Sequence, residues 1–258
     1  MLYYLLVISR RKILAQNNKL VRSLIQNVKK GNNSSFEQLF QMNVGKVYAL
    51  CLRLLADPEI AEKLTVEVFL VTWRKISLFR EGILFSSWLT GITTHTILEW
   101  IRSNNEIWNY PDQKKLKLVK DSLIQKNTDP FEIDIRLLPG KERFVFVLHE
   151  IENYTDVEVA DLLSLTLENF NDILQKSYEL LNLPIDSIDK KAYIQSCLNS
   201  LPQIIQPEKD IWKYIFTVLD KEQNSLSNKL DGNSKKSEGE NENDQKKKKF
   251  GFLNWKKK

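Results

Sequence analysis

Apolar side chains recur at intervals of three and four residues along most of the chain before Glu222, and this spacing is the feature that most restricts the fold. Between Phe36 and Leu55 they mark one continuous face of a helix, and the same pattern returns several times. Glycine and proline, with 8 and 7 residues, are too scarce to interrupt it often. The sequence therefore predicts an all-α protein built from amphipathic helices.

Helix start and stop signals divide the N-terminal part of the chain into four helices. Gly31 marks a helix end, Ser34 or Ser35 can cap the next helix, and Asp57 followed by Pro58 can start the one after it. The predicted helices are residues 13–29, a helix starting after Ser34 or Ser35, Asp57 to about Leu78, and about Ser86 to Arg102 after a break at Arg80, Glu81 and Gly82. Four helices with short connections predict a compact domain over residues 13–102.

The rest of the chain changes character several times. A polar stretch rich in Lys and Asn, with Pro111 and Pro130, predicts a linker with at most a turn or two of helix. Three helices follow, then one or two more that are broken at Pro202 and Pro207, and the last part is too polar to fold. The expected divisions are a linker over 103–135, a helical domain over 136–182, a helical extension over 183–221 and a disordered basic tail over 222–258.

Residues 154–181 have the pattern of a helix-turn-helix. Thr155 and Glu158 form a capping box at the start of the first short helix, and Ser164 and Leu165 form the turn. Thr166 caps the second helix, which in such motifs meets base edges in the major groove. Any three-helix bundle offers similar helix pairs, so this pattern alone leaves DNA binding and plain helical packing both open.

Two parts of the chain carry sets of motifs that point to one family. The first set, within residues 35–102, is Phe36–Phe40, Val47–Leu55, Asp57–Glu59, Ala61, Glu62, Glu67–Leu70, Trp73–Lys75, Phe79, Arg80 and Phe85–Leu89. The second set, within residues 137–181, is Leu137–Pro139, Glu142, Arg143, Val147, Leu148 and Tyr154–Leu181. In order and spacing the first set resembles region two, and the second set region four, of sigma factors of the extracytoplasmic-function (ECF) type, which belong to bacterial transcription.

The resemblance implies a transcription initiation factor that is not itself an enzyme. The helix over 57–76 would dock on core RNA polymerase, residues 80–102 would read and open the downstream part of promoter DNA, and the helix-turn-helix would read the upstream element. The linker would thread toward the polymerase active centre. The implied residues are Glu62, Glu67, Phe69 and Trp73 for polymerase binding; Arg80, Phe85, Trp88, His95 and Arg102 for the downstream element; and Thr166, Asn169, Asn171, Gln175 and Lys176 for DNA contact by the helix-turn-helix.

The second helix of the helix-turn-helix departs from the family's pattern. It carries Glu168, Asp172 and Glu179 against the single Lys176, and acids on that surface repel DNA phosphates. Two interpretations therefore stay open for the whole chain. It is a sigma factor that directs polymerase to promoters, or a degenerate sigma-like regulator that binds polymerase or another protein without reading the upstream element. Trp88 also has a plain alternative role, which is packing in the core.

The sequence contains no pattern that indicates catalysis, a metal site or a cofactor. His95 and His149 have no evident catalytic partner, and neither a Gly-rich phosphate loop nor a nucleophile motif occurs. Cys51 and Cys197 lie far apart in the sequence, which argues against a zinc site or disulfide framework and favours a cytoplasmic location. The apolar run Met1–Ile8 is too short to span a membrane and is wrongly flanked for a signal peptide.

Two C-terminal segments bear on partners. Leu201–Trp212 resembles a segment found beside the zinc-binding part of some anti-sigma factors, without the His and Cys of that site. Such a segment could restrain the sigma-like domains from within, and plain packing on the second domain is the alternative. Lys246–Lys258 alternates lysines with aromatics, which suits an anionic membrane surface, nucleic acid or simple solvation. The net charge of +5 agrees with a nucleic-acid partner, and an anti-sigma factor is a further partner that the resemblance implies.

Overall fold

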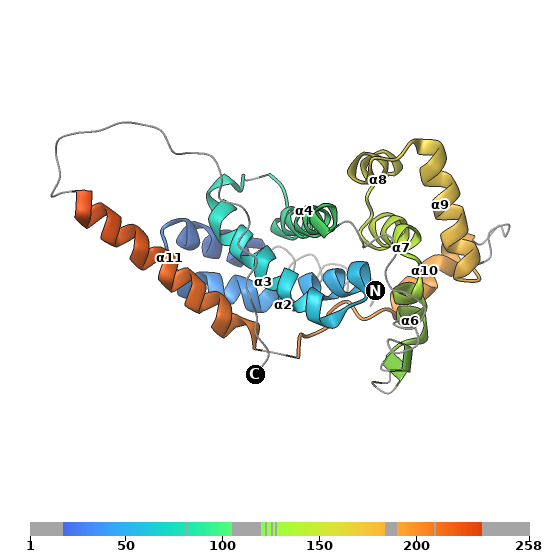
Figure 1. Ribbon diagram of the computed structural model, residues 1–258, viewed down its shortest axis with the longest axis horizontal. Helices are drawn as coiled ribbons and strands as arrows, with labels where there is room; N and C mark the ends of the chain where they lie inside the picture. Colours follow the sequence, from blue (N-terminus) through green and yellow to red (C-terminus); the bar gives the residue numbers. More distant parts are fainter. Residues whose placement is uncertain are drawn as a thin grey trace, which may run out of the picture. The chain divides into compact units, whose positions relative to one another are not determined.

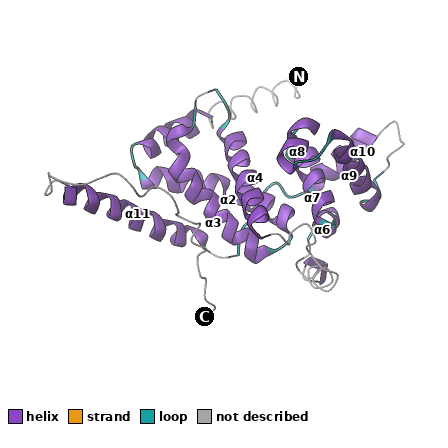
Figure 2. Cartoon of the chain, turned by 45° about the horizontal axis from the view of Figure 1, so that its top comes forward, coloured by secondary structure: helices purple, strands orange, loops and turns teal. Residues whose placement is uncertain are grey.

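The structure is a computed structural model that describes residues 18–80, 82–104, 120, 121, 123, 124, 126, 128–183, 190–208 and 210–233. Every regular element in these ranges is a helix, and they contain no strand, so the all-α prediction is confirmed (Figure 2). The chain divides into two compact units, one reaching Thr217 and one starting at Val218. The first and second helical domains described below both lie within the first of these units. The predictions for Met1–Ile8, Lys246–Lys258 and most of the linker concern segments outside the described residues.

The first domain consists of a helix over residues 18–29, α2 (Asn33–Leu55), α3 (Pro58–Lys75) with a 3-10 turn at Ile76–Leu78, and α4 (Phe85–Asn104). Asp57 caps α3 as predicted, because its carboxylate accepts hydrogen bonds from the backbone N–H groups of Glu59 and Ile60. The predicted cap of α2 was wrong. Asn32 is the cap, since its side-chain oxygen accepts from the backbone of Ser35 at 2.7 Å.

The core of this domain lies where α2, α3 and α4 pack against one another (Figure 1). Phe36 and Leu39 from α2, Phe69 and Leu70 from α3, and Ile97 from α4 are almost fully buried there. Phe36, Leu39 and Phe69 belong to the apolar stripes that the sequence spacing marks, whereas Leu70 and Ile97 are core residues that it did not single out. Burial of one face accounts for all three helices.

The second domain contains α6 (Pro130–Leu137), α7 (Gly140–Phe146), a π-helical turn at Val147–Ile151, α8 (Asp156–Leu163) and α9 (Leu167–Leu180). Helices α7 and α8 both pack on α9, and both also contact the π-helical turn that lies between them in the chain. Helix α6 occupies the end of the predicted linker. Asp129 caps it and Pro130 takes its first position, where a proline starts a helix instead of breaking one.

The C-terminal extension forms α10 (Lys190–Ser200) and α11 (Ile211–Asn233). Residues 201–208 and 210 between them are not helical, so the breaks predicted at Pro202 and Pro207 are confirmed. Helix α11 runs past Glu222 into the segment predicted to be disordered, because extending an existing helix costs little where no proline intervenes. None of the described helices is both long and apolar enough to cross a membrane.

Candidate polymerase and nucleic-acid interfaces

The two aromatic residues of the predicted polymerase-binding set lie over α2. Phe69 is buried and packs edge-on against Phe40, with ring centroids 4.8 Å apart. Trp73, about one helix turn further along α3, packs against Phe36 with ring centroids 5.1 Å apart and stays partly exposed. Phe69 therefore supports this face of α3 from beneath, and Trp73 is the aromatic residue available at its surface.

The two acidic residues of that set differ in exposure. Glu62 is only 7% exposed, and its charge lies near Tyr48. The pKa of Tyr48 is raised to about 12, mainly by burial and next by the charge of Glu62. Glu67 keeps a quarter of its side chain exposed. It forms an ion pair of 3.5 Å with Arg74, about two helix turns further along α3. Glu67 is therefore better placed than Glu62 to meet a partner.

The predicted promoter-melting aromatics form a cluster at the start of α4. Phe79, Phe85 and Trp88 contact one another with ring centroids 5.3 to 5.8 Å apart. Phe79 and Phe85 are buried and Trp88 is half-buried. Packing thus accounts for most of the surface of these rings. This agrees with the alternative role of Trp88 as a core residue, although part of its side chain stays accessible.

The cationic residues of the same predicted set are exposed on or beside α4. Arg80 lies in the loop before the helix, and His95 pairs with Glu99 at 3.4 Å. The guanidinium of Arg102 donates to the backbone oxygen of Leu162, at the end of α8, at 3.0 Å. Arg102 therefore links the first domain to the helix-turn-helix in this structure, a contact that sequence patterns could not reveal.

The helix-turn-helix has the predicted geometry. Thr155 and Glu158 form the capping box, with Glu158 accepting from the Thr155 backbone at 2.8 Å and Thr155 accepting in return. Hydrogen bonding to the Thr155 backbone also lowers the pKa of Glu158. Ser164 makes the turn in the left-handed region, with a φ of 56°, and Thr166 caps α9 through the backbone of Asn169.

The exposed face of α9 is acidic. Asn169, Asn171 and Gln175 are exposed as a DNA-reading helix requires, and so are the acids Glu168, Asp172 and Glu179. The predicted cation Lys176 forms an ion pair of 2.6 Å with Glu142 of α7, and that carboxylate raises the pKa of the lysine. The only lysine on α9 is therefore engaged within the domain, which leaves little positive charge for phosphates.

His149 has partners that are far from obvious in the sequence. Its Nδ1 lies 3.0 Å from Glu150 and its Nε2 lies 2.9 Å from Asp156, at the start of α8. The hydrogen bond with Glu150 is the main cause of a raised pKa at His149. The pairing fixes α8 to the π-helical turn, and the described ranges hold no cluster of three or more His, Cys, Asp or Glu suited to a metal.

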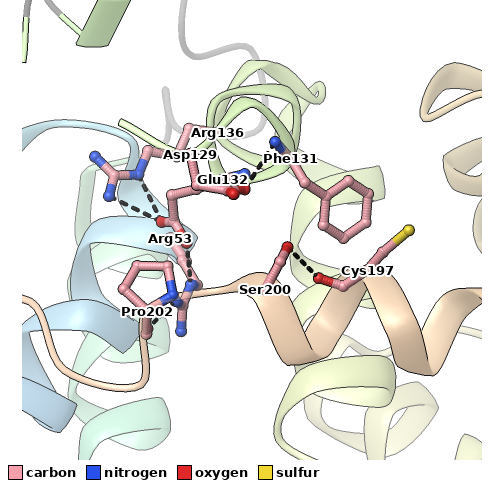
Figure 3. Close-up of polar contacts among 8 residues, drawn as sticks. All are labelled: Arg53, Asp129, Phe131, Glu132, Arg136, Cys197, Ser200 and Pro202. Atoms are coloured by element: carbon pink, nitrogen blue, oxygen red, sulfur yellow. Dashed lines mark hydrogen bonds and ion pairs between the residues drawn. The ribbon is translucent and has the colours of Figure 1, made fainter. Parts of the chain in front are cut away.

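A buried ion cluster joins the two domains and the extension (Figure 3). Glu132 of α6, which is 0% exposed, accepts from Arg53 of α2 and from Arg136 of α6, each at 2.8 Å. Arg53 also donates to the backbone oxygen of Pro202 at 2.6 Å. The i,i+4 spacing of Glu132 and Arg136 is visible in the sequence, but their partner Arg53, 79 residues earlier, is not.

Comparison with known proteins shows what the first domain resembles. Residues 39–107 match the family model of sigma-70 region 2, which spans most of α2 together with α3 and α4. Over 178 residues the chain is 24% identical to "ECF RNA polymerase sigma factor SigW" of Bacillus subtilis strain 168, covering 63% of this chain and 95% of that protein. It is 28% identical over 145 residues to "ECF RNA polymerase sigma factor SigE" of Mycolicibacterium smegmatis, covering 52% of this chain and 54% of that protein.

Two solved structures also align with the chain at low similarity. One is the sigma factor RpoE in complex with the anti-sigma factor NepR from Bartonella quintana, with a TM-score of 0.40 and 17% identity over 59% of this chain and 98% of that one. The other is CnrH in complex with the cytosolic domain of CnrY, with a TM-score of 0.41 and 20% identity over 65% and 99%. The region-two match and the curated relatives confirm the resemblance to ECF-type sigma factors.

Proposed function

We propose that this protein is a transcription initiation sigma factor that binds core RNA polymerase and directs it to promoter DNA. The observation that carries the proposal is the sigma-70 region 2 match over α2, α3 and α4. Its support within the fold is the face of α3 on which Glu67 and Trp73 are accessible above the buried Phe69. A carboxylate beside an accessible indole suits a protein interface, where aromatic residues supply contact area and charges set specificity.

The DNA-facing role in this proposal belongs mainly to α4 and the loop before it. Capture of a single strand needs cations for the backbone and aromatic surfaces for bases. Exposed Arg80, His95 and Arg102 lie on α4 or in the loop before it, and so does the half-buried Trp88, so both components lie on one helix and its approach. Helix α9, with its acidic face, contributes little affinity for duplex DNA in this proposal, and an anti-sigma factor remains a proposed partner.

The test of the proposal is binding to core RNA polymerase in the absence of DNA. We expect saturable binding by the purified chain, and a loss of affinity of roughly tenfold or more for Glu67→Lys, because a reversed charge at an interface opposes its partner's charge. Glu67 is a better site than Glu62, since a lysine at the buried position 62 would disturb the fold.

Glu168→Lys is the matched control for that experiment. It makes the same charge reversal at an exposed position on α9, away from the α3 face, and should leave the affinity for core polymerase unchanged. If the wild-type chain does not bind at micromolar concentration, or if both variants lose affinity equally, the proposed function is contradicted.

A second prediction concerns the weak DNA affinity expected of α9. Replacing Asn171, Asp172 and Gln175 with lysines should raise the affinity for duplex DNA roughly tenfold or more near 0.1 M salt, and should steepen its salt dependence, because each new phosphate contact releases a counterion. Electrophoretic mobility shift or anisotropy titrations at several salt concentrations measure both effects.

The control for that triple variant changes the same three residue types elsewhere. Lysines at Gln195, Asn199 and Asp210, which are exposed in the extension, give the same change in net charge. If this control binds DNA as tightly as the α9 variant, overall charge explains the gain and α9 has no special role. If neither variant gains affinity, charge is not what limits binding by α9.

A further inference from the structure

The segment after α10 contacts α2 at three separate points. The backbone oxygen of Pro202 accepts from Arg53 at 2.6 Å, and the backbone N–H of Ile205 donates to the oxygen of Gly45 at 3.1 Å. At the start of α11, the ring of Trp212 packs against Phe40 at 5.0 Å and Phe36 at 6.1 Å. The described residues 201–208 and 210–216, called the strap below, therefore contact α2 as an added layer of the first domain.

The strap reaches the residues that are predicted to bind polymerase. Phe36 and Phe40, which Trp212 covers, are the same rings that contact Trp73 and Phe69 of α3. Tyr214, two residues further along α11, has a pKa raised by burial and by the nearby carboxylate of Glu67. The strap thus ends near Glu67, and the ring of Phe36 lies between Trp212 of the strap and Trp73 of α3.

Helix α2 is adapted to this contact at Gly45. A Cβ atom at position 45 would collide with the side chain of Ile204, so only glycine lets the strap approach this closely. Glycine inside a helix costs about 1 kcal/mol relative to alanine. The helix itself has no need of glycine there, since its backbone is ordinary α-helix, so the residue serves the docking of the strap.

The strap is also held in a way that allows release. Residues 201–208 and 210 form no helix, and Gln203, Ile204, Gln206 and Glu208 are exposed, with Ile204 at 51%. Its anchors are Leu201, Ile211, Ile215 and the half-buried Trp212. A short segment with few anchors opens at a lower free energy than the helical core beneath it.

We propose that the strap is a built-in competitor of core RNA polymerase. It covers Phe36 and Phe40 of α2, at the border of the α3 face on which Glu67 and Trp73 stay partly accessible, and it must be displaced before polymerase can dock there. This inference rests on the proposed function, because it assumes that the α3 face is the polymerase-binding surface. Binding of polymerase would then require the opened state, and the affinity would be reduced by the fraction of molecules in which the strap is closed.

A reversible cross-link tests the inference in the full chain. Gly45→Cys combined with Ile204→Cys places two Cβ atoms about 3.4 Å apart, at the short edge of the range that a disulfide spans. Cys197→Ser removes the partly exposed native thiol, while Cys51 is fully buried and burial raises its pKa to about 12, so it stays unreactive. The same sample is then measured oxidised and reduced.

We expect the oxidised protein to bind core polymerase roughly tenfold or more weakly than the reduced protein, because the closed strap can no longer leave. Oxidised Ile204→Cys alone, in the same Cys197→Ser background, should bind as the wild type does. A release variant, Gly45→Leu, fills the space that Ile204 needs and should bind more tightly than wild type, with an unchanged helix content by circular dichroism.

The outcomes separate the two proposals. Equal affinity of the oxidised and reduced double-cysteine protein, with binding intact, overturns the strap inference and leaves the proposed function standing. Failure of every variant to bind, Gly45→Leu included, contradicts the proposed function and the strap inference together.

Discussion

Replacing Glu132 with glutamine is expected to lower the free energy of unfolding by about 3–5 kcal/mol. The carboxylate of Glu132 is 0% exposed and lies between the guanidinium groups of Arg53 and Arg136, which are themselves buried. Glutamine keeps the size of the side chain and removes its charge, so two buried cations lose the group that compensates them. Urea unfolding followed by far-UV circular dichroism measures the loss.

Glu59→Gln is the matched control for this prediction. Glu59 forms an i,i+4 ion pair with Lys63, but its side chain is 66% exposed, so water screens the pair and the same substitution should cost no more than about 0.5 kcal/mol. A loss below 1 kcal/mol for Glu132→Gln would contradict the prediction and would indicate that water reaches the cluster.

A triple replacement separates the charge from the packing. Methionine at positions 53 and 136 with leucine at position 132 removes all three charges while keeping an apolar volume, and buried ion clusters replaced in this way are often as stable as the original. We therefore expect the triple variant to recover much of what Glu132→Gln loses. The carbonyl of Pro202 loses its donor in that variant, so the recovery should stop short of completion.

Local signals account for the parts of the fold that the sequence predicts well. Asp57 and Thr155 lie directly before apolar stripes, and both cap helices as expected because capping involves neighbouring residues only. The cap of α2 was misplaced by two residues or more, since Asn32, Ser34 and Ser35 are all chemically able to cap. Helix α6 was expected only as an unplaced turn or two of helix in the linker, because Pro130 can either end a helix or begin one.

Contacts between distant segments explain the rest. The polymerase-binding face of α3 could be predicted only through the family resemblance. That Glu62 is buried there while Glu67 is accessible depends on how α2 lies beneath α3. The pairing of Lys176 with Glu142 likewise joins two helices whose packing no periodicity specifies. Gly45 was a single glycine in a helical pattern, and its purpose becomes evident only when the strap lies against it.

Replacing Arg143 with methionine should destabilise the protein by about 3 kcal/mol or more. Arg143 is fully buried and donates to the backbone oxygens of Leu54 at 3.0 Å, Arg136 at 3.1 Å and Leu138 at 3.0 Å. Two of these oxygens belong to the last turns of α2 and α6, where carbonyl groups have no partner within their own helix. The guanidinium thus completes two helix ends at once, and each buried acceptor that loses its donor costs about 1–3 kcal/mol.

Arg102→Met is the control for the Arg143 prediction. Arg102 is exposed and donates to one carbonyl, so its replacement should lower the free energy of unfolding by less than about 1 kcal/mol. Urea unfolding of both variants, followed at 222 nm, compares them directly. Equal losses would mean that Arg143 acts through ordinary surface-like contacts. A large loss confined to Arg143→Met would show that this side chain, beside the Arg53–Glu132 pair, helps to hold the first domain to the second, because Leu54 lies in the first and Arg143 in the second.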